Sequence, residues 1–223
     1  MDNSKKANLL LHEIQQMFRH TPSPLSTIDF TGVMFPSMNM RGHAQAITFY
    51  EKVLDELKER VANKIAVFPG EKYRICYEGI PPWQYLGKFL KDFASHGVTL
   101  LDSAYDLVWR REILDPVRPL ESLAEAMYLT AANTGSKTIA DWFIQRCKEN
   151  SADGLVVALT CPCVYSTFLG VAEIVREELG IPVMVLDYHQ CDVHQFSWGD
   201  IESKLDIFME IVTSKPSGER LKP

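Results

Sequence analysis

The residues best suited to chemistry are two cysteines that follow an apolar run in the C-terminal part of the chain. Cys161 and Cys163 lie just after residues 154–159, and thiolates are soft donors that bind iron–sulfur clusters and zinc. A Cys-x-Cys spacing is equally typical of two small, buried side chains. Cys76 and Cys147 lie inside an apolar run and a helical pattern, and we expect a structural role for both because buried structural thiols are inert.

A second metal hypothesis uses the segment that follows residues 182–186. His189, Cys191 and His194 lie in that segment, and with Cys161 and Cys163 they would supply the ligands of a tetrahedral zinc site. Their spacing matches no common zinc motif. An ordinary polar loop therefore remains the alternative interpretation.

Four other residues are candidates for contact with a substrate, and three of them are aromatic. They are Pro82, Trp83, Tyr105 and Trp109. Aromatic rings line ligand-binding walls, but they also cover the edges of sheets. The residue types alone leave both interpretations open.

Glycine-rich nucleotide motifs are missing from the sequence. It contains no G-x-G-x-x-G, no complete P-loop and no G-x-S-x-G, so nothing indicates a dinucleotide site, a nucleotide-binding loop or a hydrolase nucleophile. Residues 135–138 (GSKT) resemble the end of a P-loop but lack its first glycine. We predict that they begin a helix, with Ser136 as its cap.

The elements that would position these residues are alternating strands and helices after residue 70. Such alternation predicts a parallel α/β sheet with right-handed crossovers, and ligands bind at the carboxyl ends of its strands. Gly97 and Gly180 stand where a glycine ends a helix. We expect strands at residues 73–77, 98–101, 154–159 and 182–186, and helices at residues 83–96, 120–132, 137–150, 168–179 and 198–212.

The N-terminal part of the chain has a helical rather than an alternating pattern. Apolar residues at helical spacing predict helices at 7–19 and 43–62, and the prolines at 22 and 24 end the first. Residues 31–39 fit neither pattern clearly. We therefore predict three parts: a helical segment 1–66, a flavodoxin-like α/β domain 67–212 with about four strands and flanking helices, and a flexible tail 213–223.

Composition excludes several classes of protein. The 223 residues carry 29 acidic and 23 basic side chains, a net charge of −6, which gives no footprint for nucleic acid. No apolar run approaches the length of a membrane span, and the N-terminus lacks a signal-peptide core. The five cysteines, an odd count, indicate reduced thiols or metal ligands. We expect a cytoplasmic protein.

Across residues 5–212 the sequence resembles the 2-hydroxyacyl-CoA dehydratase / benzoyl-CoA reductase family of iron–sulfur subunits. The family's subunits are usually larger, and the resemblance here is to the C-terminal half. Several stretches carry it in order: residues 64–83 ending YRICYEGIPPW, residues 115–124 (DPVRPLESLA), residues 153–156 (DGLV), Cys161, residues 180–183 (GIPV), Asp187, Asp192, and residues 196–197 followed by 205–210 (LDIFME).

The resemblance implies one-electron chemistry on acyl-CoA thioesters, through a ketyl radical. The enzyme would be an anaerobic lyase, a 2-hydroxyacyl-CoA dehydratase, or an oxidoreductase of benzoyl-CoA reductase type. The cofactor would be a [4Fe–4S] cluster, with Cys161 as the leading ligand, Cys163 as an alternative, and an incomplete ligand set in this chain.

The resemblance also implies partners. They would be a related iron–sulfur subunit in a heterodimer and a separate ATP-dependent activator protein that injects the electron. The absence of a complete P-loop in this chain agrees with that division of labour. Two other functions remain as alternatives: a structural or regulatory relative without a cluster, and a zinc-binding module.

Overall fold

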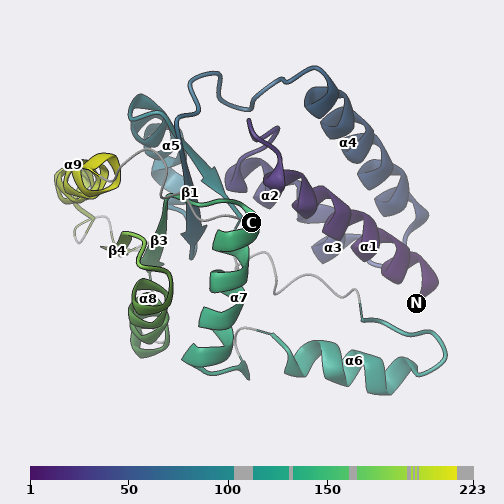
Figure 1. The fold of residues 1–223 in the computed structure, drawn as a ribbon. Coiled ribbons are helices and arrows are strands. Elements are labelled where there is room, and N and C mark those ends of the chain that lie inside the picture. The colour runs from purple at the N-terminus through teal and green to yellow at the C-terminus, as the bar shows by residue number, and fades with distance from the viewer. Residues whose placement is uncertain are drawn as a thin grey trace. The chain divides into compact units, whose positions relative to one another are not determined.

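The computed structural model describes residues 1–102, 113–130, 133–160, 165–189, 192, 194 and 196–214. The chain divides into two compact units (Figure 1). Unit 1 comprises Met1–Pro69 and Tyr105–Thr134, and unit 2 comprises Gly70–Ala104 and Gly135–Pro223. The boundaries predicted at residues 66 and 212 stay predictions.

Unit 1 is helical in its described residues. A residue from nearly every turn of α1 and α4 is buried, and these two long helices pack on each other. Residues 31–39, which fit no pattern clearly in the sequence, lie in two short helices. The helices of the unit are α1 (Asp2–Gln16), a 3₁₀ turn (Met17–Arg19), α2 (Thr27–Val33), α3 (Phe35–Asn39), α4 (Ala44–Ala62) and α6 (Pro119–Tyr128).

Local hydrogen bonds hold the short helices of unit 1 in place. Ser26 caps α2 in a reciprocal box: its hydroxyl oxygen accepts from the Asp29 amide at 3.3 Å, and the Ser26 amide donates to the Asp29 carboxylate at 2.9 Å. The buried Tyr50 hydroxyl of α4 accepts the amide of Ser37 at 2.9 Å. These contacts compensate for helices too short to be stable on propensity alone.

Unit 2 is an α/β unit around a four-stranded parallel sheet, as the sequence predicts. The strand order is β2-β1-β3-β4, which matches the first four strands of the flavodoxin-like order. In chain order the elements are β1 (Tyr73–Glu78), a 3₁₀ turn (Trp83–Tyr85), α5 (Leu86–Ser95), β2 (Val98–Leu101), α7 (Ser136–Glu149), β3 (Gly154–Leu159), α8 (Tyr165–Leu179), β4 (Val183–Asp187) and α9 (Trp198–Ser214).

Helices cover both faces of this sheet, with α5 and α9 on one face and α7 and α8 on the other (Figure 1). The α5–α9 face buries a cluster that includes Ile75, Phe89, Phe93, Val156 and Phe208. All six residues of β3 are buried, because helices cover both of its faces and a strand lies on each side. This explains why residues 154–159 read as a continuous apolar run.

Several helix ends differ from the predictions: α1 begins at Asp2 rather than at residue 7, α5 at Leu86 rather than at residue 83, and α8 at Tyr165 rather than at residue 168. The helix predicted to reach residue 132 ends at Tyr128, because the side chains of Thr130 and Asn133 take the Met127 carbonyl as their acceptor. Ser136 is not a cap: Gly135 is the N-cap of α7 and Ser136 its first residue. Gly97 and Gly180, with φ of 75° and 62°, end α5 and α8 as predicted.

Across the described parts of the chain, no helix is both long enough and apolar enough to cross a membrane.

Candidate functional site at the carboxyl edge of the sheet

The strand order places a switch point between β1 and β3. The chain moves from β1 outward to β2, and then returns to β3 and continues to β4 on the other side. In sheets of this kind the ligand crevice lies outside the carboxyl ends of the two central strands, where the chain reverses direction. The segments that leave these strands begin at Gly79 and at Thr160.

Gly79 allows the backbone leaving β1 to pass close to β3. Its φ is 108°, which side chains rarely adopt, and an added Cβ would lie 2.5 Å from the carbonyl oxygen of Ala158. Only glycine meets both conditions. The residue therefore fixes the direction in which the following segment, with Pro82 and Trp83, leaves the sheet.

Two buried tyrosine hydroxyls hold the same segment. The Tyr188 hydroxyl, just after β4, donates to the carbonyl oxygen of Ile80, and the Tyr77 hydroxyl of β1 lies 3.2 Å from that oxygen and 3.1 Å from the Tyr188 hydroxyl. Burial raises the pKa of both hydroxyls above the ordinary value of 10.0, and for Tyr77 the neighbouring Tyr188 adds to the shift. Both hydroxyls therefore stay protonated and able to donate.

These tyrosines predict a loss of stability in alkali. The native state keeps protons that the unfolded chain releases near pH 10, so their contribution is complete below pH 10 and declines above it. We expect the free energy of unfolding to fall by about 1.4 kcal/mol per pH unit for each tyrosine. Urea unfolding of the unsubstituted chain and of Tyr188→Phe between about pH 9 and 11.5 measures how steeply the free energy of unfolding falls with pH. The slope should be smaller in Tyr188→Phe by the contribution of one tyrosine.

Phe208→Leu is the control for that experiment, because it weakens the same core without removing a titrating group. It should lower the whole curve at constant slope. An equal slope in Tyr188→Phe and the unsubstituted chain would show that the hydroxyl is not held as described.

An aromatic cluster stands beside the tyrosine pair. The Tyr85 ring stacks on Phe196, with centroids 4.5 Å apart and planes 19° apart, and Trp198 packs against both rings. Phe196 also meets Tyr188 edge to face at 5.9 Å. Trp83, two residues before Tyr85, is 44% exposed. The cluster thus joins the segment after β1 to the start of α9 and leaves an indole at the surface.

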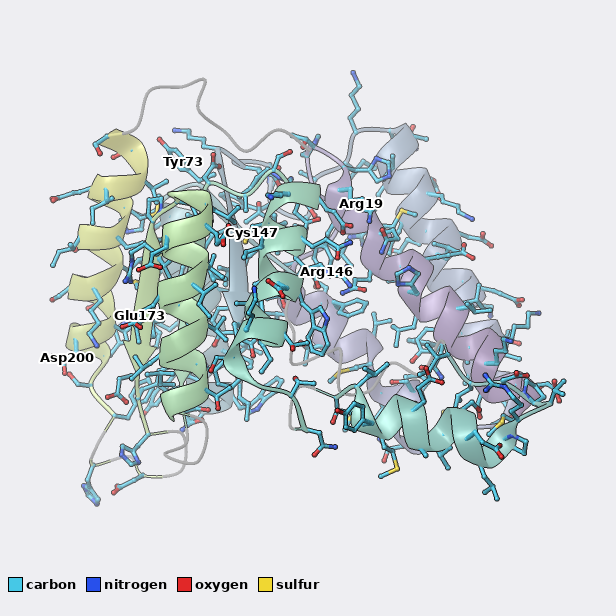
Figure 2. The ribbon with its side chains drawn as sticks, turned by 60° about the horizontal axis from the view of Figure 1, so that its bottom comes forward. Arg19, Tyr73, Arg146, Cys147, Glu173 and Asp200 are labelled. Carbon is cyan, nitrogen blue, oxygen red and sulfur yellow. The ribbon has the colours of Figure 1, made fainter. Side chains whose placement is uncertain are left out.

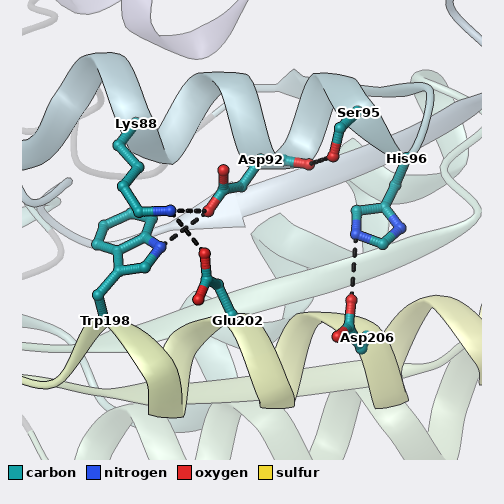
Figure 3. Close-up of polar contacts among 7 residues, drawn as sticks. All are labelled: Lys88, Asp92, Ser95, His96, Trp198, Glu202 and Asp206. Carbon is teal, nitrogen blue, oxygen red and sulfur yellow. Dashed lines mark hydrogen bonds and ion pairs between the residues drawn. The ribbon is translucent and has the colours of Figure 1, made fainter.

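Polar contacts between α5 and α9 hold Trp198 of the aromatic cluster in place (Figure 3). Lys88 lies 3.0 Å from Asp92 and 2.6 Å from Glu202, with its ammonium 4.5 Å from the centre of the Trp198 ring. The Trp198 indole N–H donates to Asp92 at 2.9 Å. The charge network and the cation–π contact hold the first turn of α9 on α5.

Three carboxylates at this edge of the sheet could offer oxygen ligands to a metal ion. Glu78 ends β1 and Asp102 follows β2, both buried, whereas Asp187 ends β4 and is exposed. Asp102 lies 3.4 Å from the Arg146 guanidinium. Among the residues that the structure describes, no three His, Cys, Asp or Glu side chains are grouped to hold a metal ion.

Two of the cysteines lie in the interior, as expected. Cys76 of β1 and Cys147 of α7 are fully buried, and Figure 2 labels Cys147 beside Arg146. The Cys76 thiol is the main cause that raises the pKa of Cys147 well above its usual value, followed by burial. A protonated, enclosed thiol is a poor metal ligand and a poor nucleophile.

The structure describes only some of the candidate residues. Pro82 is buried and is the N-cap of the 3₁₀ turn, whereas Trp83 is exposed and is the first residue of that turn. His189 is half-buried, and the His194 amide donates to Asp192 at 2.9 Å. Five candidates lie outside the described residues: Tyr105, Trp109, Cys161, Cys163 and Cys191. Their proposed roles stay predictions.

Sequence reasoning missed the Tyr77–Tyr188 pair and the stack of Tyr85 on Phe196. A signal for the first was available, because Tyr77 alternates with Ile75 and so shares its buried face. The partner could not be found, because it lies 111 residues further along the chain.

Comparisons with known proteins give one family and several relatives. The family model described as 2-hydroxyglutaryl-CoA dehydratase, D-component, matches residues 1–212. The lactoyl-CoA dehydratase subunit alpha of Anaerotignum propionicum is 27% identical over 214 residues, which cover 95% of this chain and 51% of the relative. A benzoyl-CoA reductase subunit of Thauera aromatica is 25% identical over 240 residues, which cover 99% of this chain and 54% of the relative.

A third relative gives the same proportions. The (R)-2-hydroxyisocaproyl-CoA dehydratase alpha subunit of Clostridioides difficile is 25% identical over 198 residues, 87% of this chain and 48% of the relative. The chain therefore spans about half the length of the curated relatives that it matches.

Proposed function

The chain belongs to the family of the 2-hydroxyglutaryl-CoA dehydratase D-component, as its sequence resemblance indicated. On that premise we propose that it is a subunit, or half of a subunit, of a 2-hydroxyacyl-CoA dehydratase or benzoyl-CoA reductase-type enzyme. One observation supports the location of its site. The switch point between β1 and β3 brings together the segment with Pro82 and Trp83 and the end of the strand that precedes Cys161.

The cofactor proposed is a [4Fe–4S] cluster, which when bound would supply a low-potential electron to an acyl-CoA thioester. Such clusters need soft thiolates, whereas the described strand ends carry the carboxylate oxygens of Glu78, Asp102 and Asp187. The resemblance to the family makes Cys161, two residues past the end of β3, the leading ligand and Cys163 the alternative. Two cysteines do not make a complete set, so further ligands come from elsewhere.

The described residues of unit 2 bind and orient in this proposal. Trp83 offers an exposed ring and Pro82 a rigid backbone beside the switch point, and Gly79 and the tyrosine pair hold both in place. Tyr105 and Trp109 are proposed as further substrate contacts. The proposed partners are an acyl-CoA substrate, a related iron–sulfur subunit and an ATP-dependent activator protein, in the cytoplasm.

The test is the metal content of the full chain prepared without oxygen. We expect iron and acid-labile sulfide in near-equal amounts, reduced at least tenfold in Cys161→Ser because that position supplies a thiolate. Cys163→Ser distinguishes the alternative ligand. Cys147→Ala is the matched control, since its buried thiol lies against Cys76, and it should leave the iron content per folded molecule unchanged.

The other outcomes of this test are distinct. Zinc in place of iron, lost in Cys161→Ser and Cys191→Ser, would replace the cluster with the zinc-binding function. Iron that stays bound in both Cys161→Ser and Cys163→Ser would remove these residues from the ligand set. A chain without metal would mean that its own ligands cannot build a site alone, and the remaining ligands would then be sought in a partner domain.

A further inference from the structure

Helix α6 of unit 1 turns its large apolar side chains outward. Leu120, Leu123 and Met127 recur at the spacing that forms one face of a helix, and all are exposed, Leu120 to 77% and Met127 to 56%. Ser122 and Ala126 form the opposite face, which is buried. A surface helix of a self-sufficient domain has the reverse arrangement, with its apolar face toward the core.

Hydrogen bonds fix this orientation of the helix. The Ser122 hydroxyl accepts the Asp115 amide at 2.9 Å and lies 3.3 Å from the Asp115 carbonyl oxygen. The Asp115 carboxylate accepts the Val117 amide at 3.0 Å and lies 3.5 Å from the Arg118 guanidinium. The segment leading into α6 is thereby tied to the buried side of the helix's first turn, and the helix cannot turn its leucines inward without breaking these bonds.

The exposed side chains form one apolar surface, which we call the α6 stripe. Val117, 86% exposed, lies just before the helix, and Tyr128, 71% exposed, at its end. The stripe comprises Val117, Leu120, Leu123, Met127 and Tyr128. Five large apolar groups amount to several hundred Å², the size of patch that marks interaction sites and about half of one partner's share of a standard interface.

The charges beside the stripe argue against a second copy of this chain as its occupant. Glu121 and Glu125 are exposed and lie one turn apart on the same side of the stripe. A symmetric dimer through α6 would use the same patch on both copies. In an antiparallel symmetric pair of α6 helices, Glu121 and Glu125 of both copies would lie on the same side of the interface, and like charges across an interface are unfavourable.

We propose that the α6 stripe is the docking surface for the part of a family subunit that this chain does not match. The curated relatives are about twice as long as the region that they share with this chain. The shared region includes α6. A full-length relative therefore carries this helix together with a second half that this chain does not match. The occupant is an apolar surface bordered by basic side chains that face Glu121 and Glu125. The proposal rests on family membership and on no property of a cluster.

Site-specific photo-crosslinking tests the proposal in the full chain, made in its native host. The photoreactive residue p-benzoylphenylalanine replaces Leu120 or Met127 in the stripe, or Lys58 on the exposed side of α4 as the control. After irradiation, mass spectrometry identifies the cross-linked peptides. We expect adducts from positions 120 and 127, at least tenfold above those from position 58, whose peptides come from the unmatched half of a family subunit.

A second variant separates docking from folding. Leu120→Glu with Met127→Glu should shift the unfolding midpoint by no more than about 2 °C, since both side chains are exposed. With p-benzoylphenylalanine placed at Leu123, a third position of the stripe, the same two substitutions should abolish the adduct that Leu123 otherwise forms. Adducts to peptides of this chain would assign the stripe to a second copy. Adducts to an unrelated protein, or none above the control, would overturn the proposal. No metal or activity enters the readout, so a failed cluster assignment leaves this result intact.

Discussion

Gly79→Ala is expected to destabilise unit 2 by about 3 kcal/mol or more, because the substitution adds two costs. An alanine at a φ of 108° is held in a conformation that L-residues avoid, and its Cβ would lie 2.5 Å from the carbonyl oxygen of Ala158. The carbonyl belongs to the buried strand β3 and cannot turn away without losing its place in the sheet. Urea unfolding at neutral pH measures the loss.

Gly87→Ala is the matched control for that substitution. Gly87 lies in α5 with no atom within 4 Å of an added Cβ, and alanine favours a helix over glycine by about 1 kcal/mol. The control should therefore be neutral or stabilising. If Gly79→Ala unfolds within about 0.5 kcal/mol of the unsubstituted chain, β1 does not leave the sheet as described.

The consequence of Gly79→Ala reaches the candidate site directly. Any relief of the clash must move residues 79–83 away from β3, and this displaces the Ile80 carbonyl from the two tyrosine hydroxyls. Trp83 would move with it. Gly79 therefore matters both for the stability of unit 2 and for the placement of Pro82 and Trp83, the proposed substrate contacts.

The sheet could be predicted because local signals agree with the final structure. Residues 154–159 are buried on both faces and read as a continuous apolar run, and Gly97 and Gly180 mark helix ends by their positive φ. The order of the strands could not be predicted in this way, because it depends on pairing between segments that are far apart in the sequence. Strand ends alone predict a site at the carboxyl edge, and that location stays a prediction. The switch point between β1 and β3 is visible only with the strand order.

Other features depend on tertiary contacts that no local pattern carries. The α6 segment looks like any amphipathic helix, and its outward apolar face follows from hydrogen bonds between Asp115 and Ser122. The short helices α2 and α3 have weak propensity and depend on a capping box and on Tyr50. Arg74 sits in a strand that otherwise reads as apolar, and its burial depends on partners at positions 71 and 150.

Arg74→Met is expected to cost about 3–5 kcal/mol, because it leaves a buried carboxylate without its guanidinium. Arg74 lies 2.7 Å from Glu71, and the two side chains are only 2% and 4% exposed. Its Nε also donates to the Asn150 carbonyl at 2.9 Å. Methionine fills the space of the side chain's stem, so the loss reports the charge and hydrogen bonds rather than a cavity. Denaturant unfolding at neutral pH measures it.

The double variant Arg74→Met with Glu71→Met tests that cause. A buried ion pair replaced by apolar residues of similar volume is often close to neutral, so the second substitution should recover most of the loss, with a coupling energy of at least about 1 kcal/mol. A double variant as unstable as the sum of the single ones would assign the loss to packing instead.

The same variants separate the two ends of the sheet. Arg74 is the second residue of β1, and its backbone amide and carbonyl pair with Asp153 just before β3. These contacts lie at the amino edge, whereas Gly79, Tyr188 and the strand that precedes Cys161 meet at the carboxyl edge. We therefore expect Arg74→Met to lower stability without reducing, per folded molecule, the iron content expected of the proposed cluster. Loss of iron in molecules that remain folded would show that the two edges are coupled through β1.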